Sequence, residues 1–292
     1  MKKNPIIGCM RWGKWGANFD TNQYYKLINQ CIELGINKFD HADIYGDYTT
    51  EADFGNALKN NTGLRSKIEI ITKTGIQLVC NNKPMHTIKS YNTTKSHIIQ
   101  SVEQSLKNFN TDYIDELLIH RPDVLLNPAE LAETATRLIN SGKIKRMGVS
   151  NFSLHKLAIL QKYIKLHSHQ IEINTLQTES FTNGMLDFAF QHNIEIQAWS
   201  PINVKLFTLF NEPNYTSNQL IMQAIQKLSL KYHCTDNQIL VAFLYAHPVH
   251  IVPVIGTTQF ERILEAKNAM QINITSEDFY LIYTACMGKE VD

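Results

Sequence analysis

Short apolar runs alternate with longer segments of helical periodicity along this chain. Short runs in which at least half of the residues are apolar occupy residues 36–39, 68–72 and 114–119, and their length predicts short buried strands. Before the first run, residues 24–32 carry apolar side chains at the spacing of one helical face, and Gly35 is placed to end that helix. The pattern is typical of an α/β protein.

The same alternation continues to the C-terminus. It predicts eight strands, at residues 5–10, 36–40, 68–72, 114–119, 146–149, 170–173, 194–198 and 251–255. It predicts helices at residues 24–32, 52–58, 94–109, 128–141, 154–166, 185–191 and 219–230, with two more after Thr258 and Ser276, and a loop at residues 200–216. A strand–helix repeat of roughly 30 residues over about 250 predicts a (β/α)8 TIM barrel. Because no linker interrupts the repeat, we expect a single domain over residues 1–292.

Local signals support several boundaries of these elements. Asn127 and Pro128 provide an N-cap and a first-turn proline, and Thr258 with Glu261 forms a capping-box pattern. Residues 74–92 have weak periodicity and are long for a connection inside a domain, which predicts a functional lid or a disordered loop.

Each predicted strand delivers polar or ionisable residues at its C-terminal end, where barrels carry their chemistry. In chain order these ends are Met10, Asp40, Lys73, His120, Ser150–Asn151, Gln170 or Glu172, Trp199–Ser200 and Gly256–Thr257. If the second to fourth strands are neighbours in a parallel sheet, their ends bring Asp40, Tyr45, Lys73 and His120 to one place. A tyrosine beside a lysine and a histidine suits proton transfer.

Two other chemistries fit these strand ends poorly. A metal-dependent hydrolase needs several histidines and carboxylates at matching ends, and His41, Asp43 and His120 are too few and wrongly placed. We therefore expect no metal. A retaining glycosidase needs two carboxylates about 5 Å apart, where this chain has His120 and Trp199.

Carbonyl reduction fits better, because it needs a hydride donor and an acid that protonates the oxygen. A free tyrosine has a pKa of about 10, so we expect the Lys73 cation to lower the pKa of Tyr45 and Asp40 to hold that lysine. His120 would donate a second hydrogen bond to the developing alkoxide.

The remaining strand ends suit a nicotinamide cofactor. Ser150, Asn151 and Gln170 offer the donors and acceptors that a carboxamide needs, and Trp199 offers a flat face for the ring. The helix start at Thr257–Thr258 is an anion site of the kind that barrels use for phosphate. The sequence has no GxGxxG, so we expect the nucleotide to lie extended across the barrel mouth.

Composition excludes several other partners. Lys and Arg total 28 against 27 Asp and Glu, so no strong field favours nucleic acid or a membrane surface. Five scattered cysteines predict a reducing compartment, and no apolar run approaches the roughly 20 residues of a membrane span. We expect a cytoplasmic monomer whose partner is a small-molecule carbonyl substrate.

Taken one at a time, these residues have structural explanations. A tyrosine after a strand usually packs with a hydrated hydroxyl, and His120 before Arg121–Pro122 could cap a strand. The conjunction of four strand ends in one mechanism outweighs those readings. Trp12 and Trp15 either line the substrate pocket or pack in the core, and His167 and His169 suggest a polar loop away from the chemistry.

Four separated motifs resemble the aldo-keto reductase family, over essentially the whole chain. They are GINKFDHADIYG at residues 35–46, LLIHRPD at 117–123, KIKRMGVSNF at 143–152 and QAWSP at 197–201. The nearest likeness is to bacterial general aldo-keto reductases with DHADIYG and IHRPD. The resemblance implies a barrel that reduces carbonyls with Tyr45 as the acid and Asp40, Lys73 and His120 as its partners.

The resemblance also implies where the cofactor binds. The implied cofactor residues are Met10, Arg11, Ser150, Asn151, Gln170, Trp199, Ser200, Pro201, Gly256, Thr257, Thr258 and Arg262. Arg262 matches the family's arginine near the adenosine phosphate, but Gly256 stands where many members have a lysine. We therefore expect NADPH (NADP+) with a moderate preference, NADH being possible. A second class stays open, because some barrels of this family, such as the potassium-channel β-subunits, act chiefly as nucleotide-sensing binding proteins.

Overall fold

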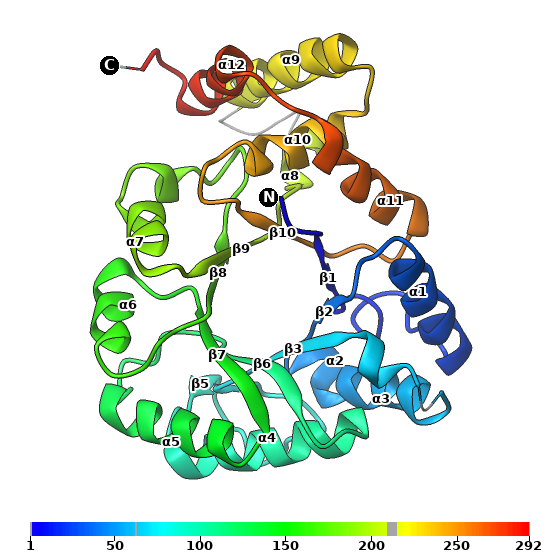
Figure 1. Ribbon diagram of the computed structural model, residues 1–292, viewed down its shortest axis with the longest axis vertical. Helices are drawn as coiled ribbons and strands as arrows, with labels where there is room; N and C mark the ends of the chain where they lie inside the picture. The colour runs from blue at the N-terminus through cyan, green and yellow to red at the C-terminus, as the bar shows by residue number, and fades with distance from the viewer. Residues whose placement is uncertain (1, 62, 209–214, 292) are drawn as a thin grey trace. The chain divides into compact units, whose positions relative to one another are not determined.

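The computed structural model describes residues 2–61, 63–208 and 215–291, and its strands close into a barrel (Figure 1). The barrel order is β1-β10-β9-β8-β7-β6-β3-β2, which confirms the predicted (β/α)8 fold. Its strands are β1 (Ile6–Gly8), β2 (Lys38–Asp40), β3 (Glu69–Thr74), β6 (Ile114–Ile119), β7 (Ile144–Ser150), β8 (Ser168–Glu172), β9 (Glu195–Trp199) and β10 (Val252–Ile255).

Contacts within the chain group into two compact units. The N-terminal unit comprises Ile6–Gln170 and Gly256–Phe260, and the C-terminal unit comprises Met1–Pro5, Ile171–Ile255 and Glu261–Asp292. The expectation of a single domain over the whole chain stays a prediction.

The N-terminal unit has the predicted strand–helix alternation. Its helices are α1 (Thr21–Glu33), α2 (Tyr45–Tyr48), α3 (Thr50–Lys59), α4 (Lys95–Phe109), α5 (Pro128–Asn140) and α6 (Leu154–Gln161), with a 3-10 turn, η1 (Arg65–Lys67). The predicted N-cap of α5 is confirmed, because the Asn127 side chain accepts from two backbone N–H groups. Helix α6 ends earlier than predicted, since Gln161 uses its side chain to accept from the Leu166 N–H and Leu166 is buried.

The long connection after β3 is more ordered at its base than expected. Residues 74–92 contain an antiparallel pair, β4 (Ile76–Gln77) and β5 (Ser90–Tyr91). Tyr48 pins this pair, because its hydroxyl donates to the Ile76 carbonyl (3.3 Å) and accepts from the Leu78 N–H (3.0 Å). Thr93 then donates to the Asp123 carboxylate (2.8 Å), which ties the connection to the loop after β6.

Of the helices described in the C-terminal unit, two were not predicted from the apolar pattern, α8 (Lys205–Thr208) and α10 (Asp236–Tyr245). Its elements besides strands are η2 (Glu179–Phe181), α7 (Met185–His192), α8 (Lys205–Thr208), α9 (Tyr215–Tyr232), α10 (Asp236–Tyr245), α11 (Phe260–Asn268), which begins in the N-terminal unit, η3 (Ala269–Gln271) and α12 (Ser276–Met287). In α10, residues 239–245 are all buried, so the helix has no polar face to reveal it. The predicted loop at 200–216 lies partly outside the described residues. Of the helices described, none is long and apolar enough to cross a bilayer.

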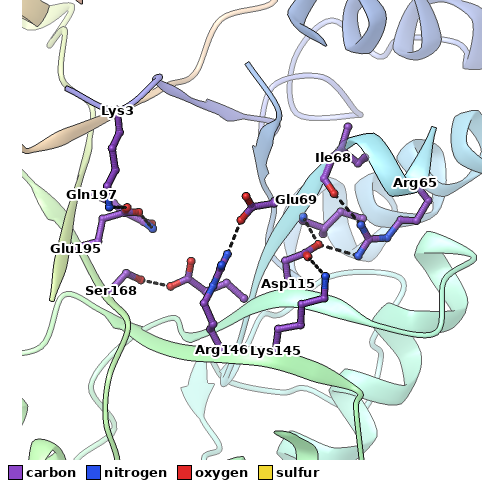
Figure 2. Close-up of polar contacts among 12 residues, drawn as sticks. Lys3, Arg65, Ile68, Glu69, Asp115, Lys145, Arg146, Ser168, Glu195 and Gln197 are labelled. Atoms are coloured by element: carbon purple, nitrogen blue, oxygen red, sulfur yellow. Dashed lines mark hydrogen bonds and ion pairs between the residues drawn. The ribbon is translucent and has the colours of Figure 1, made fainter. Parts of the chain in front are cut away.

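The N-terminal ends of β3, β6 and β7 carry paired charges (Figure 2). Asp115 accepts from Arg65 (2.8 Å), Lys145 (2.8 Å) and the Ile70 N–H (2.9 Å). Arg146 pairs with Glu69 in the same region. These side chains bond to one another and to the backbone, which is how barrels usually stabilise this end.

Candidate active site

Lys73 lies at the centre of the hydrogen bonds at the opposite, C-terminal strand ends. Its ammonium donates to the Asp40 carboxylate (2.7 Å), the His41 carbonyl (2.8 Å) and the Tyr45 hydroxyl (3.1 Å). Lys73 is about 1% exposed, and an ammonium has three protons to donate. The sequence-predicted group of Asp40, Tyr45 and Lys73 is therefore brought together with every lysine donor used.

The backbone around Tyr45 has an unusual local conformation. Gly46, Asp47 and Tyr48 have φ values of 60°, 58° and 71°, so three successive residues are left-handed. Only the first is glycine, and strain of this kind usually occurs where the surrounding structure enforces it. Here Asp47 accepts from Lys14 (2.6 Å) and Trp15 (3.0 Å), which holds the turn.

Burial and nearby charges set the protonation states of Lys73 and Tyr45. Burial lowers the pKa of Lys73, but Asp40 and Tyr45 outweigh it and raise the Lys73 pKa above its ordinary value, so the lysine stays charged. Burial raises the pKa of Tyr45 more than Lys73 lowers it. The expected net lowering of the Tyr45 pKa is therefore wrong in direction, although Lys73 acts in the expected sense.

His120 faces the tyrosine ring from the end of β6. The ring centroids of Tyr45 and His120 are 6.0 Å apart at 79°. Burial, followed by the charges of Lys73, Arg121 and Lys89, holds the pKa of His120 well below its usual range. The imidazole is therefore neutral at physiological pH, and its Nδ1 has no hydrogen-bond partner among the described residues.

Two other residues of the same motif have no evident chemical task. His41 is fully buried against the rings of Phe54 (4.5 Å) and Phe109 (5.1 Å), and burial lowers its pKa to about 3. Burial, followed by the nearby Glu51 charge, raises the pKa of Asp43 to about 7, and Ser101 donates to this carboxylate (3.0 Å).

The predicted carboxamide-binding residues meet at the ends of two neighbouring strands. Ser150 and Gln170 are register partners on β7 and β8, and the Asn151 N–H donates to the Gln170 carbonyl (3.0 Å). Asn151 is left-handed (φ 60°) and its side chain donates to the Ser150 hydroxyl (2.7 Å). A hydroxyl and two amides at one place fit the donors and acceptors of a nicotinamide carboxamide.

Gln170 also contacts the lysine group directly. Its side-chain amide donates to Asp40 Oδ1 (2.8 Å), while Lys73 occupies Oδ2. Both Gln170 and Asp40 are buried, at 3% exposure each. A hydrogen-bonded chain therefore runs from Gln170 through Asp40 and Lys73 to the Tyr45 hydroxyl.

The other predicted cofactor residues lie in separate places along the chain. Met10 and Arg11 are exposed after β1, and Gly256, Thr257 and Thr258 follow β10. In the C-terminal unit Trp199 ends β9, and Ser200 and Pro201 follow it. Ser200 is left-handed (φ 50°), and its carbonyl accepts from Asn174 (3.1 Å). Arg262 is in the first turn of α11, which begins at Phe260, two residues after the predicted Thr258 cap.

The structure separates the roles of the two early tryptophans. Trp12 is fully buried and its indole donates to the Thr257 carbonyl (3.0 Å), so it packs in the core. Trp15 is 37% exposed, and its ring centroid lies 6.1 Å from that of Tyr45. Of the two, Trp15 is the one placed beside the tyrosine.

Two residues near the site were missed or misplaced by the sequence. Asp47 accepts a hydrogen bond from Trp15 and orients it. The sequence gave no sign of this role, because Asp47 lies outside the predicted strand ends. His169 was expected in a polar loop, yet it is fully buried in β8 and its ring Nε2 accepts from the Phe152 N–H (3.0 Å). This hydrogen bond holds the backbone directly after Ser150 and Asn151.

A polar cleft of about 710 Å³ lies elsewhere in the N-terminal unit. It is lined by residues of α3, α4 and the connection 74–92, including Asp43 and His97, and its lining does not include Tyr45, Lys73 or His120. No group of His, Cys, Asp or Glu within the described ranges could hold a metal ion.

The sequence matches a known family and several curated proteins. The model of the aldo/keto reductase family matches residues 6–285. The oxidoreductase YcsN of Bacillus subtilis is 40% identical over 290 residues, covering 98% of this chain and 95% of its own length. The 6-dehydroglucose reductase of Agrobacterium fabrum is 38% identical over 286 residues, with 96% and 94% covered.

Solved structures match in fold at lower identity. The glycerol dehydrogenase AKR11B4 of Gluconobacter oxydans superposes with a TM-score of 0.84 at 22% identity, covering 98% of this chain and 93% of the other. An aldo/keto reductase of Klebsiella pneumoniae, solved with NADP and acetate, gives a TM-score of 0.74 at 21% identity, with 94% and 87% covered.

Proposed function

The chain belongs to the aldo/keto reductase family, and on that premise we propose that it reduces aldehydes or ketones to alcohols with NADPH, Tyr45 being the proton donor. Membership of this family makes the chain an NAD(P)H-dependent oxidoreductase. The observation that carries the finer proposal is the 3.1 Å hydrogen bond from the Lys73 ammonium to the Tyr45 hydroxyl.

The direction of that hydrogen bond leaves Tyr45 able to act as an acid. Because the Tyr45 oxygen accepts from Lys73, the phenol proton is directed elsewhere and can be donated to a carbonyl oxygen. Lys73 then stabilises the tyrosinate that forms, and Asp40 keeps Lys73 charged and in place. NADPH, when bound, would supply the hydride.

His120 would assist at the same carbonyl oxygen. Since its pKa is lowered, the ring is neutral and can donate one hydrogen bond without competing with Tyr45 as the proton source. A neutral donor stabilises negative charge that develops on the oxygen, as a preorganised oxyanion-hole group does.

The cofactor assignment extends the resemblance to named residues. Ser150, Asn151 and Gln170 would hold the carboxamide, and Trp199 would stack on the ring. We assign the pyrophosphate to the segment from Ser200 onward and the adenosine phosphate to Arg262. The other residues of the proposed cofactor site are Met10, Arg11, Pro201, Gly256, Thr257 and Thr258. The fit of the carboxamide residues to an amide supports that part of the assignment, and the other residues rest on the resemblance to the family.

NADPH preference is proposed to depend on Arg262. A guanidinium next to the 2′-phosphate makes a charge-assisted contact, which is worth roughly ten- to a hundredfold in affinity. We expect Arg262→Ala to weaken NADPH and to leave NADH unchanged, as measured by the dissociation constants of both cofactors. Equal weakening of the two cofactors would place Arg262 at the adenine, and tighter NADH binding by the wild type would reject the preference.

Substrate class is tested by following NADPH oxidation against a panel of aldehydes, ketones and sugars. Because a relative at 38% identity is named a 6-dehydroglucose reductase, aldehydes of oxidised hexoses belong in the panel. The proposal expects saturable turnover with at least one carbonyl class and formation of the matching alcohol. Tight NADPH binding with no turnover across the panel would favour a nucleotide-sensing binding protein of the same fold.

A further inference from the structure

The side chain of Gln170 is held in one orientation by the charge of Asp40. A carboxylate only accepts hydrogen bonds, so an amide 2.8 Å from Asp40 Oδ1 must present its NH2 group to it. The amide oxygen of Gln170 then faces away from Asp40. If the amide were reversed, two acceptors would meet at this distance inside a buried site.

The strength of this constraint follows from burial and charge. Both side chains are 3% exposed, so water cannot replace either partner. Hydrogen bonds to a charged group exceed neutral ones, and losing this one would disfavour the reversed amide roughly ten- to a hundredfold. Asp40 is fixed in turn, because Lys73 holds its second oxygen at 2.7 Å.

We propose that Asp40 has a second task besides holding Lys73: it orients Gln170 so that the amide oxygen accepts the N–H of the nicotinamide carboxamide. This inference rests on the proposed NADPH-dependent function. Asp40 is then a positioning residue for both reactants, since one oxygen acts through Lys73 on the proton donor and the other acts through Gln170 on the hydride donor.

The hydrogen bond to Asp40 gives the neutral Gln170 amide a fixed direction at the proposed carboxamide site. Ser150 and Gln170 are partners across β7 and β8, so a carboxamide between them would meet a hydroxyl and an oriented amide oxygen. The carboxamide has one carbonyl oxygen and one NH2 group. An amide oxygen of fixed direction on Gln170 would bind the NH2 side, which selects one orientation of the carboxamide over the reverse.

An NADP+ analogue with an acetyl group in place of the carboxamide tests this directly. The analogue keeps the carbonyl oxygen and loses the N–H donor. Dissociation constants for NADP+ and the analogue are measured by calorimetry on wild type, Asp40→Asn, Gln170→Met and Tyr45→Phe. ADP-ribose that carries the 2′-phosphate and lacks nicotinamide is the reference ligand for the adenosine end.

We expect the wild type to bind NADP+ roughly tenfold more tightly than the analogue, because the methyl group cannot donate a hydrogen bond to the Gln170 oxygen. In Asp40→Asn the ratio should fall below about threefold, since an asparagine offers either an oxygen or an NH2 group to Gln170. Gln170→Met should lower the ratio of the two dissociation constants in the same way. Tyr45→Phe leaves the Asp40–Gln170 contact intact and should keep it, and all four proteins should bind the fragment equally.

Three results would overturn the inference. They are a wild type that does not distinguish the two dinucleotides, an Asp40→Asn variant that keeps the full ratio, and a Tyr45→Phe variant that loses it. If NADP+ does not bind at all while the fold is intact, the proposed function fails and this inference falls with it. That outcome differs from tight NADP+ binding without discrimination, which removes the inference alone.

A second measurement does not depend on the folding of the Asp40→Asn variant. In wild type with 15N-labelled glutamine, the side-chain amide of Gln170 is assigned as the signal that Gln170→Met removes. We expect slow hydrogen exchange of this buried amide in the free protein and the same hydrogen-bonded signal after NADP+ binds. Fast exchange before binding, with protection only afterwards, would mean that the cofactor rather than Asp40 orients Gln170.

Discussion

The two ends of the barrel strands in the N-terminal unit carry charged groups that are used differently. At the N-terminal ends, Arg65, Lys145 and the Ile70 N–H all converge on one acceptor, Asp115. At the C-terminal ends, the lysine donors diverge from Lys73 to a carboxylate, a carbonyl and a phenol.

The difference lies in where each chain of hydrogen bonds stops. The hydrogen-bond partners of Asp115 are two cationic side chains and a backbone N–H, which stabilise its charge. The Lys73 group ends on Tyr45, whose hydroxyl accepts one hydrogen bond and still has a proton to donate. Buried ion pairs of similar geometry can therefore stabilise a barrel at one end and prepare a reaction at the other.

Removing Lys73 should have the largest effect, because it disturbs both charge pairing and chemistry. Lys73→Met leaves Asp40 buried without its cation, which typically costs about 3–5 kcal/mol of unfolding free energy. Turnover should fall by about 10² to 10⁴, since Tyr45 loses the charge that stabilises its anion. Urea unfolding and NADPH oxidation measure the two effects. A Lys73→Met variant with wild-type turnover would contradict the assignment.

Removing Asp115 should affect stability alone. Asp115→Ala leaves the Arg65 guanidinium, whose side chain is 12% exposed, without its carboxylate and with uncharged partners among the described residues: two carbonyls, a hydroxyl and the Tyr113 ring. We expect a loss of about 3 kcal/mol in unfolding free energy, the lower end for a broken buried pair. Turnover per folded molecule should be unchanged at a temperature well below the midpoint. A specific loss of turnover would show that the two strand ends are coupled.

His41 should produce a smaller effect that depends on pH. Its pKa is about 3 in the fold against an ordinary value near 6.5, so the unfolded chain binds a proton first as pH falls. The unfolding free energy therefore decreases as pH falls from 6.5 towards 3, and His41 accounts for roughly 2 kcal/mol of that between pH 7 and pH 5.

His41→Leu keeps an apolar side chain against Phe54 and Phe109 and removes this titration. We expect the variant to lose about 2 kcal/mol less than the wild type on going from pH 7 to pH 5. Some acid sensitivity should remain, because burial lowers the pKa of His169 to about 3 as well. Identical pH dependence in wild type and His41→Leu would mean that His41 gains a partner or solvent in the folded state.

Most of the fold could be predicted because local pattern and tertiary burial agree in most elements. Strand β6 was predicted to the residue, since Ile114 begins it and the apolar residues Leu117–Ile119 end it before His120. Helix α10 could not be found, because burial on every side removes the amphipathic period. The antiparallel pair β4–β5 is only two residues per strand, too short for any alternation to appear.

The site was predictable where chemistry depends on which residue ends a strand. Asp40, Lys73 and His120 follow apolar runs, so their positions were accessible from the sequence. The direction of the Tyr45 pKa was not, because burial outweighs Lys73 and burial is known only from the fold. The contact between Gln170 and Asp40 joins residues 130 positions apart on β8 and β2, two strands that are not neighbours in the barrel order, so it exists only in the closed barrel.

The central claim is that the proton comes from Tyr45, and single-turnover reduction tests it most directly. Enzyme loaded with NADPH is mixed with a carbonyl substrate found in the panel, and the loss of NADPH absorbance is followed for wild type, Tyr45→Phe and Tyr48→Phe. Tyr48, three residues after Tyr45, is the matched control. Tyr48→Phe removes the same kind of hydroxyl, but one that bonds to the backbone of Ile76 and Leu78. The account predicts that Tyr45→Phe binds NADPH normally and slows this step by about 10² to 10⁴, whereas Tyr48→Phe stays within roughly tenfold of wild type. A wild-type rate in Tyr45→Phe would contradict it.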